Sequence, residues 1–225
     1  MTSSIALRIA SIRQQLPASV RLIAVTKQVS VAAMRSAYNA GIRDFGESRI
    51  QEATSKQQQL QDLPDITWHL IGGLQSNKAK KALESFDWIH SLDSLKLAQR
   101  LDRLAQELSC QPKVCLQVKL LDDPNKSGWT VPELLDSLPE LDRCQHLQIR
   151  GIMSIPPLGL TEAEIINFFT QTRELAAQIG QQNWSNIQMQ QLSMGMSGDY
   201  HLAVQAGSTM VRLGSILFGE RQNNS

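Results

Sequence analysis

The sequence lacks the features of a disulfide-bonded protein, a metal centre or a membrane span. Its three cysteines, Cys110, Cys115 and Cys144, form no CxxC pair, and their odd number cannot complete a disulfide framework, so we expect a protein of the reducing cytoplasm. The four histidines show no HExxH or other close ligand spacing, which leaves a metal site unsupported. No apolar run approaches about 18 residues, so we expect no transmembrane helix.

The chain also lacks an excess of either charge. Lys and Arg number 22 and Asp and Glu 21, so the formal net charge is +1. Such a balance gives no bulk field that would recruit nucleic acid or an anionic membrane surface. Any bound anion must therefore be held by a local site.

Acidic residues are absent from the first 43 positions. A segment of this kind can imitate an organellar transit peptide. However, apolar residues recur at helical spacing from Ile5 to Leu16, after caps at Ser3 and Ser4, and predict an amphipathic first helix. This helix leads through Pro17 directly into a strand pattern, which leaves no room for a cleavage site.

From residue 21 onward, strand patterns and helix patterns alternate. The strand patterns lie at 21–26, 43–46, 66–71, 87–92, 114–120, 147–153, 189–193 and 210–213. The helix patterns lie at 34–41, 48–60, 77–84, 93–108 with a cap at Asp93, after Pro132, at 161–180 with a capping box, and at 199–206.

Eight strands in alternation with helices favour an α/β barrel. A doubly wound sheet could use the same alternation, but 225 residues divided into eight βα units fit a compact TIM-type (β/α)8 barrel better. With 42% hydrophobic residues and no linker or low-complexity tract, we expect residues 1–225 to form a single domain around one core. The predicted fold is this barrel with an extra N-terminal helix.

The first strand pattern ends abruptly in Lys27. In a barrel the functional side chains lie at the carboxyl ends of the strands. A partly desolvated amine there loses some preference for its charged form and can attack an aldehyde to form a Schiff base. The alternative is a solvated lysine that closes a strand.

Small, glycine-rich turns follow the seventh and eighth strand patterns, at 193–198 and 212–215. Barrels commonly bind phosphate at these two turns, because backbone N–H groups there can approach the oxygens closely. Either turn alone favours a structural role for its glycines. The two together, beside a lysine at a strand end, favour an anion site.

The sequence resembles a known family over nearly the whole chain. The motifs that carry the resemblance are Leu22–Lys27, Phe45–Glu52, Trp68–Lys78, Ile149–Met153, Leu192–Asp199 and Arg212–Gly219. They look like those of the pyridoxal phosphate homeostasis proteins, whose barrel is that of the alanine racemase N-terminal domain. The resemblance therefore implies the same barrel and pyridoxal 5'-phosphate (PLP) as cofactor.

The resemblance also implies a role for each matching residue. Lys27 would form the Schiff base with PLP, Arg212 would face the pyridine nitrogen, and Met153 and Ser48 would lie near the ring. The residues that would cradle the phosphate are Ser193, Gly195, Gly214 and Ser215. Family members commonly have Asn at the position of Ser48 and His at that of Gly73, so this chain departs from the pattern at two places.

Two classes of function are compatible with the sequence, a carrier of PLP and an enzyme. The resemblance implies a non-catalytic protein that binds PLP and governs its supply and the balance of amino acids. The alternative is a PLP-dependent amino-acid racemase, and a Schiff-base aldolase acting on a phosphosugar is more distant. Arg212 keeps its own proton and disfavours carbanion chemistry, although alanine racemase shares this arginine. We expect no robust catalysis, because the sequence shows no second β-domain and offers only Tyr38 and Tyr200 as phenolic bases.

The expected partners follow from the same reasoning. We expect the chain to be a monomer that binds PLP and amino acids and contacts PLP-dependent apo-enzymes transiently, without nucleic acid or membrane. The basic cluster Lys78, Lys80 and Lys81 is most simply a solvated helix face, and the alternative is a docking surface for a protein partner.

Overall fold

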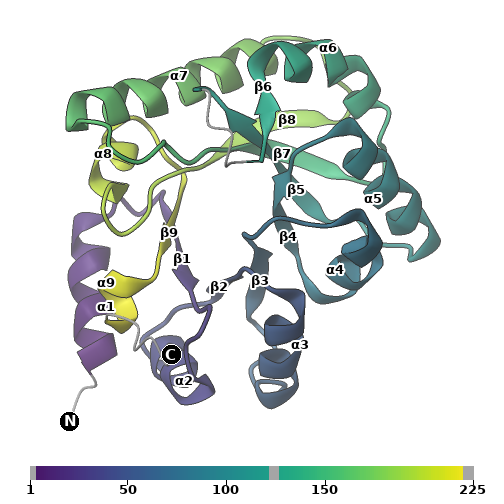
Figure 1. Cartoon of the computed structure of the whole chain (residues 1–225). Coiled ribbons are helices and arrows are strands. Elements are labelled where there is room, and N and C mark those ends of the chain that lie inside the picture. Colours follow the sequence, from purple (N-terminus) through teal and green to yellow (C-terminus); the bar gives the residue numbers. More distant parts are fainter. Residues whose placement is uncertain (1–3, 122–126, 220–225) are drawn as a thin grey trace.

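Eight parallel strands close into a barrel in the computed structural model, which describes residues 4–121 and 127–219. Around the barrel the strands follow the order β4-β3-β2-β1-β9-β8-β7-β5, and a pairing between β4 and β5 completes the ring (Figure 1). Their bounds are β1 Arg21–Val25, β2 Asp44–Glu47, β3 Thr67–Leu70, β4 Trp88–Leu92, β5 Lys113–Lys119, β7 Gln148–Met153, β8 Ile187–Ser193 and β9 Met210–Leu213. The predicted barrel is confirmed.

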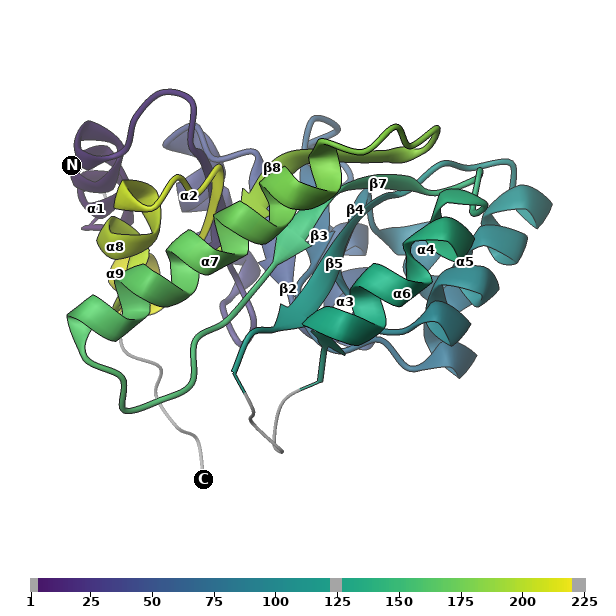
Figure 2. The ribbon, with the colours of Figure 1, turned by 90° about the horizontal axis from the view of Figure 1, so that it is seen from above.

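Helices surround this ring on the outside (Figures 1 and 2). Their bounds are α1 Ser4–Gln15, α2 Val31–Asn39, α3 Ile50–Gln59, α4 Ala79–Ser85, α5 Leu95–Glu107, α6 Val131–Asp142, α7 Glu162–Gly180, α8 Tyr200–Gln205 and α9 Ser215–Phe218, with a 3-10 turn, η1, at Ser76–Lys78. The long helix α7 packs over β8 and β7 (Figure 2). No helix in the described part of the chain combines the length and apolar character that a bilayer-spanning segment needs.

The extra N-terminal helix joins distant parts of the chain. Helix α1 packs against α2 and α9. Nη1 of Arg8 donates to the carbonyl of Leu217 in α9 at 3.4 Å. The hydroxyl of Tyr200 in α8 donates to Oε1 of Gln15 at 2.7 Å. The predicted first helix is therefore part of the barrel's outer layer.

Many element boundaries differ from the sequence patterns by one to three residues, and three of the differences are informative. Helix α5 is capped by Ser94, whose side chain accepts from the N–H of Leu97, rather than by Asp93. Strand β8 begins two residues earlier than predicted, at Ile187. The two-residue strand β6, Trp129–Thr130, was not predicted; it pairs with β5 beside the ring, and Thr130 caps α6 in a capping box with Glu133. In each case a local hydrogen bond or pairing decides between neighbours of similar propensity.

The apolar core has two layers, because side chains alternate along each strand. Leu22 and Ala24 of β1 belong to the layer between strands and helices. Ile23, between them, belongs to a separate cluster within the barrel, whose buried members are Ile23, Trp88, Cys115, Met153 and Met210. The barrel interior is thus packed with side chains.

Candidate functional site

A cavity of about 320 Å³ opens at the carboxyl ends of the strands. Its volume lies within the range of about 300–1,000 Å³ that is typical of small-molecule sites. The lining residues come from the ends of β1, β2, β3, β7, β8 and β9: Val25, Lys27, Ser48, Ile71, Ile155, Met196, Ser197, Gly198, Arg212, Gly214 and Ser215. Among these described residues are two cationic side chains and no acidic one, which suits an anionic ligand.

Lys27 enters this cavity from a tightly held turn. It follows β1 directly and is half-buried. The N–H of Thr26 donates to the carbonyl of Gly46 in β2, and the N–H of Val29 donates back to the carbonyl of Thr26, both at 2.9 Å. Gln28 has a positive φ of 61°, and its N–H donates to Oε1 of Glu52 at 2.6 Å. A non-glycine residue rarely adopts this conformation unless its surroundings impose it.

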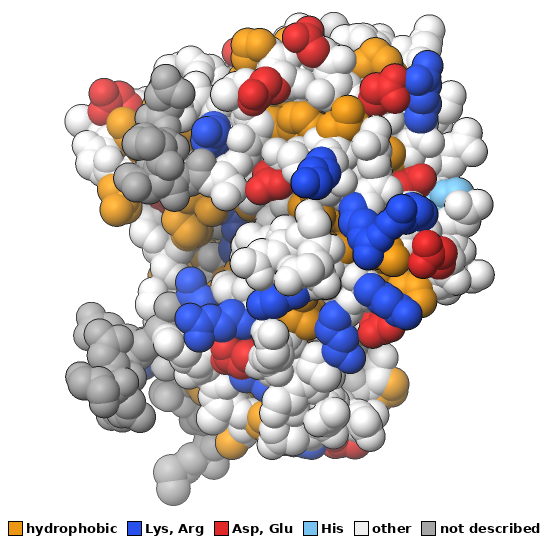
Figure 3. Space-filling view, turned by 45° about the vertical axis from the view of Figure 1, so that its right-hand side comes forward, with side chains coloured by type: hydrophobic (Ala, Val, Ile, Leu, Met, Phe, Trp, Pro, Cys, Tyr) orange, Lys and Arg blue, Asp and Glu red, His pale blue; other side chains and the backbone are white. Residues whose placement is uncertain are grey.

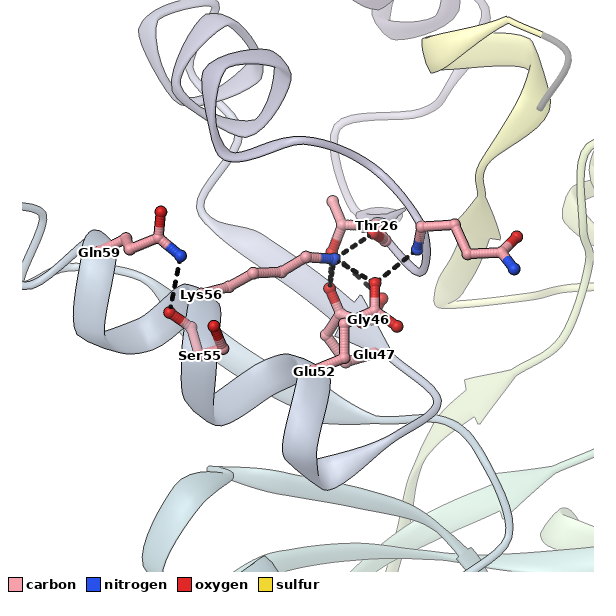
Figure 4. Close-up of polar contacts among 8 residues, drawn as sticks. Thr26, Gly46, Glu47, Glu52, Ser55, Lys56 and Gln59 are labelled. Carbon is pink, nitrogen blue, oxygen red and sulfur yellow. Dashed lines mark hydrogen bonds and ion pairs between the residues drawn. The ribbon is translucent and has the colours of Figure 1, made fainter. Parts of the chain in front are cut away.

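A buried ionic network holds Gln28 in this conformation from the side of helix α3 (Figure 4). The ammonium of Lys56 in α3 donates to the carbonyl of Thr26 at 2.6 Å, to Oε1 of Glu47 at 2.8 Å and to Oε1 of Glu52 at 2.6 Å. The hydroxyl of Thr26 also donates to Oε1 of Glu47 at 2.6 Å. Burial raises the pKa of Glu47, although Lys56 and Thr26 oppose this effect. The network fixes the backbone on both sides of Lys27.

Two turns, which follow the neighbouring strands β9 and β8, form another part of the cavity wall. Ser197 and Gly198 follow β8, and Gly214 and Ser215 follow β9. The N–H of Gly214 donates to Oγ of Ser197 at 3.2 Å, so the two turns touch. Hydroxyl groups and small residues that expose backbone N–H groups are the usual means of holding a phosphate in a barrel.

Arg212 reaches the cavity from β9 with only 4% of its surface exposed. Its Nη1 donates to the carbonyl of Ser193 at 2.5 Å and to the hydroxyl of Ser193 at 2.6 Å, and its Nη2 donates to the carbonyl of Ser154 at 3.1 Å. Burial lowers the pKa of Arg212 to about 10, with Asp199 opposing, so the guanidinium stays charged at neutral pH. These three bonds leave two of its five N–H hydrogens for other acceptors.

Five of the eight residues proposed from the sequence line this one cavity: Lys27, Ser48, Arg212, Gly214 and Ser215. The structure places the other three elsewhere. Ser193 is fully buried behind Arg212, and its hydroxyl is engaged in the barrel interior. Gly195 is buried under the turn, with a φ of +95°, where an added Cβ would lie 2.6 Å from Cβ of Ala203. Met153 lines a neighbouring cavity.

That second cavity, of about 250 Å³, shares Ile71 and Ile155 with the first. Its lining also includes Met153, Gly73 and Lys119. Gly73 is exposed, and a Cβ added there would meet nothing within 4 Å. The position at which the family commonly has His is therefore open space at the edge of the site.

Sequence reasoning missed Met196, Ser197 and Gly198, although it noticed their motif. Ser193 pairs with Met153 and Met210 in the strand ladder, so it belongs to the barrel wall. The residues that reach the mouth are those that follow the last ladder pair. The end of the strand pattern at residue 193 was the signal that could have found them.

Neither tyrosine lines the cavity. The hydroxyl of Tyr38 donates to Asp65, and the Arg43 guanidinium lies 3.8 Å from the centre of its ring. Tyr200 is buried, with its hydroxyl bound to Gln15. Both phenols are thus engaged in hydrogen bonds away from the cavity.

The predicted lysine cluster and the possibility of a metal site can also be compared with the structure. Lys and Arg side chains gather on the face seen in Figure 3, with acidic and apolar side chains between them. In the predicted lysine cluster, Lys80 and Lys81 are exposed, and Nζ of Lys81 lies 3.8 Å from Oε2 of Glu84. Across residues 4–121 and 127–219, no group of three or more His, Cys, Asp or Glu side chains is arranged to hold a metal ion.

Comparison with known proteins gives close relatives along the whole chain. Residues 2–222 match the family of the alanine racemase N-terminal domain. A pyridoxal phosphate homeostasis protein from Synechocystis sp. is 54% identical over 206 residues, which cover 92% of this chain and 94% of that protein. A protein of the same name from Escherichia coli is 37% identical over 208 residues, which cover 91% and 87% of the two chains.

Solved structures agree with these relatives. PipY from Synechococcus elongatus without PLP is 58% identical, with a TM-score of 0.93 over 96% of this chain and 100% of that chain. The same protein with PLP bound gives 57% identity and a TM-score of 0.92, with the same coverage. An alanine racemase from Clostridium difficile shares the fold, with a TM-score of 0.76 over 98% of this chain and 60% of that chain, at 14% identity.

Proposed function

The chain belongs to the family of pyridoxal phosphate homeostasis proteins, and from that premise we propose that it binds PLP through a Schiff base on Lys27 and governs PLP supply without robust catalysis. The observation that carries the proposal is the single cavity that brings Lys27, Arg212 and the two turns together. A relative that shares 57% of its residues and covers 96% of this chain has been solved with PLP bound.

The described residues fit the cofactor in chemistry. PLP carries an aldehyde, a pyridine nitrogen and a phosphate, and it acts as an electron sink when it is bound. Lys27 supplies the amine for the aldehyde. The two turns supply hydroxyls and backbone N–H groups for the phosphate, with Ser197 and Gly198 in the place that the sequence suggested for Ser193 and Gly195.

Arg212 supports a holding role for the remaining contact. It keeps its own proton, so it would donate an N–H to the pyridine nitrogen of bound PLP and supply no proton to it. The electron sink is weakest when that nitrogen is unprotonated, which disfavours carbanion chemistry. Ser48 and Met153, which line the two adjoining cavities, would bound the space around the ring.

A racemase-type enzyme is the second candidate, because the barrel and Arg212 are compatible with it. Racemisation needs a base on each face of the reacting carbon. Tyr200 is a poor second base, since its hydroxyl is bound to Gln15 on the outer layer. We therefore propose partial reactions with amino acids at most, because each missing acid or base forfeits about 10²- to 10⁴-fold in rate.

Absorption spectroscopy of the purified protein tests the binding proposal. We expect a visible Schiff-base band with PLP, and borohydride should fix the cofactor to the peptide that contains Lys27. Lys27→Ala should abolish this adduct and keep the fold, while Lys119→Ala, in the neighbouring cavity, should retain it. An adduct on another lysine would refute the assignment.

Exchange of the α-hydrogen of amino acids for deuterium in heavy water tests the absence of robust catalysis. The holo-protein is incubated with a panel of L- and D-amino acids, and exchange is followed by NMR. We expect slow exchange or none. Rapid exchange with one amino acid, lost in Lys27→Ala, would identify an enzyme instead.

The remaining parts of the proposal concern partners and location. We propose a cytoplasmic monomer that meets PLP-dependent apo-enzymes transiently and releases PLP to them through the open mouth of its cavity. Sedimentation equilibrium tests the monomer. Transfer tests the release: a PLP-dependent apo-enzyme should regain activity with the holo-protein, and the borohydride-reduced protein is the control that should restore none.

A further inference from the structure

A line of hydrogen bonds runs through the barrel interior from Arg212 to Asp44. Nη1 of Arg212 donates to the hydroxyl of Ser193 at 2.6 Å, and this hydroxyl lies 2.8 Å from Nδ1 of His90. Nε2 of His90 lies 2.9 Å from Nδ1 of His69, whose Nε2 lies 2.9 Å from Oδ1 of Asp44. Asp44 begins β2, at the opposite end of the barrel from the cavity. We call these five residues the relay.

The relay lies among apolar side chains. Both imidazole rings are fully buried, and so is Ser193. The indole of Trp88 stacks on His69 with ring centres 5.9 Å apart and an interplanar angle of 13°, and it also packs against His90 at 5.9 Å. Hydrogen bonds in such a place are stronger than in water, and an unmade one is more costly.

The two ends of the relay fix the direction of every bond in it. Arg212 can only donate, and the ionised carboxylate of Asp44 can only accept. Burial lowers the pKa of His69 and, more strongly, of His90, so both rings are neutral at neutral pH and each has one donor and one acceptor. His69 must then donate from Nε2 to Asp44 and accept at Nδ1. His90 must donate from Nε2 and accept from the Ser193 hydroxyl at Nδ1.

This direction decides how Ser193 meets Arg212. Because the hydroxyl hydrogen is used by His90, a lone pair of Oγ is left facing Nη1 of Arg212. The carbonyls of Ser193 and Ser154 accept two further hydrogens. The buried guanidinium has no carboxylate within ion-pair distance among the described residues, and the relay is the line of dipoles that connects it to one.

We propose that His90 is a positioning residue that, through Ser193, holds Arg212 in the orientation that presents its remaining N–H groups to the cofactor, and that His69, held by Asp44, fixes the tautomer in which His90 accepts from Ser193. The inference rests on the proposed function for its ligand, PLP. It assigns to the two histidines an action through Arg212 and no contact with the cofactor.

Two substitutions of His90 separate its bond to Ser193 from its bond to His69. In His90→Asn the side-chain oxygen replaces Nδ1 as acceptor for Ser193, and the bond to His69 is lost. In His90→Gln the side-chain nitrogen replaces Nε2 as donor to His69, and the acceptor for Ser193 is lost. Each variant breaks one buried bond, so we expect similar losses of thermal stability.

PLP affinity should nevertheless separate the two variants. We expect His90→Gln to bind PLP about tenfold more weakly, with a shifted absorption maximum, because an unaccepted hydroxyl hydrogen turns toward Arg212. The PLP affinity of His90→Asn should lie within about twofold of that of the wild type, and its absorption maximum should be unchanged. His146→Gln, a histidine outside the barrel interior, is the control and should change neither. Equal affinities in the two His90 variants, or the reverse order, would overturn the proposal.

Nitrogen-15 NMR of the protein without PLP tests the relay independently of the cofactor. At about pH 7.5 both rings should show the neutral Nε2–H tautomer. An Nδ1–H tautomer of His90, or a protonated ring, would overturn the direction of the relay even if PLP binds. Absence of PLP binding by the wild type, with both tautomers as expected, would refute the proposed function and leave the relay as a structural feature only.

Discussion

The ammonium of Lys56 lies 2.8 Å from Oε1 of Glu47, and both side chains are buried between α3 and the end of β2. Oε2 of Glu47 has no hydrogen-bond partner among the described residues. Burial is the main reason that the pKa of this carboxyl is raised. The charge of Glu47 therefore depends on Lys56, which also holds the carbonyl of Thr26, next to Lys27.

We expect Lys56→Met to lower the free energy of unfolding by about 3–5 kcal/mol, because it leaves the Glu47 carboxylate buried and unpaired. Urea denaturation measures this change. Lys80→Met, at an exposed lysine of α4, is the matched control and should stay within about 0.5 kcal/mol of the wild type. Adding Glu47→Leu to Lys56→Met should recover much of the loss, and additive losses would contradict this account.

Substitutions of Ser197 and Ser193 should affect the affinities for PLP and for unphosphorylated pyridoxal differently. If Ser197 binds the phosphate, Ser197→Ala should weaken PLP about tenfold and leave pyridoxal unchanged, because a hydrogen bond to a charged group is worth about 1.5–3 kcal/mol. Ser193 acts through Arg212, so Ser193→Ala should weaken both ligands by the same factor. Fluorescence titration of each variant with PLP and pyridoxal measures the ratio. A loss of affinity for PLP alone in Ser193→Ala would identify Ser193 as the phosphate ligand instead.

Gly195→Ala should destabilise the protein without PLP by about 1–3 kcal/mol. The substitution places a side chain at a φ of +95° and a Cβ at 2.6 Å from Cβ of Ala203. Gly198→Ala is the matched control in the same turn, since an added Cβ there meets nothing within 4 Å. Urea denaturation should find Gly198→Ala close to the wild type, and similar losses in the two would show that the clash relaxes.

Stability should fall in mild acid because of the two buried histidines. Burial holds the pKa of His69 and of His90 below 6.5, whereas the unfolded rings take up a proton near that pH. Their neutral form is thus compatible with the fold above about pH 6.5, and stability is lost below it by at most about 1.4 kcal/mol per pH unit for each ring. Urea denaturation between about pH 7 and 5 should show this slope, and His90→Asn should reduce it. An unchanged slope in His90→Asn would contradict the assignment.

The barrel could be predicted from the sequence because its strands are buried on both faces. Runs such as Leu22–Val25 are apolar without interruption, and Gly or cap residues separate them from helix patterns. The cap of α5 could not be predicted, because Asp93 and Ser94 are both good caps and adjacent. Strand β6 is too short for a periodic signal, since it exists only through its pairing with β5.

The site could be predicted in outline for the same reason. Strand ends mark the mouth of a barrel, so the sequence could predict that Lys27 and Arg212 lie at the same end, where both line one cavity. The sequence does not show which residue of a turn is the last in the ladder, so it could not show that Ser193 is buried in the barrel wall. The relay could not be predicted, because His69 and His90 lie 21 positions apart and Ser193 lies 103 beyond His90. Only the register of the strands brings them together.

The contact between α1 and α9 has a consequence for synthesis of the protein. Arg8 and Leu217 lie 209 positions apart, and α9 starts at Ser215 in the wall of the cavity. Contacts of such sequence separation form late, because the intervening chain must be ordered first. A nascent chain still lacking Leu217 on the ribosome cannot seat this wall against its N-terminal helix. The pocket wall that begins at Ser215 is therefore among the last parts of the chain to be made, and a chain truncated before α9 has no complete pocket in which to hold the cofactor.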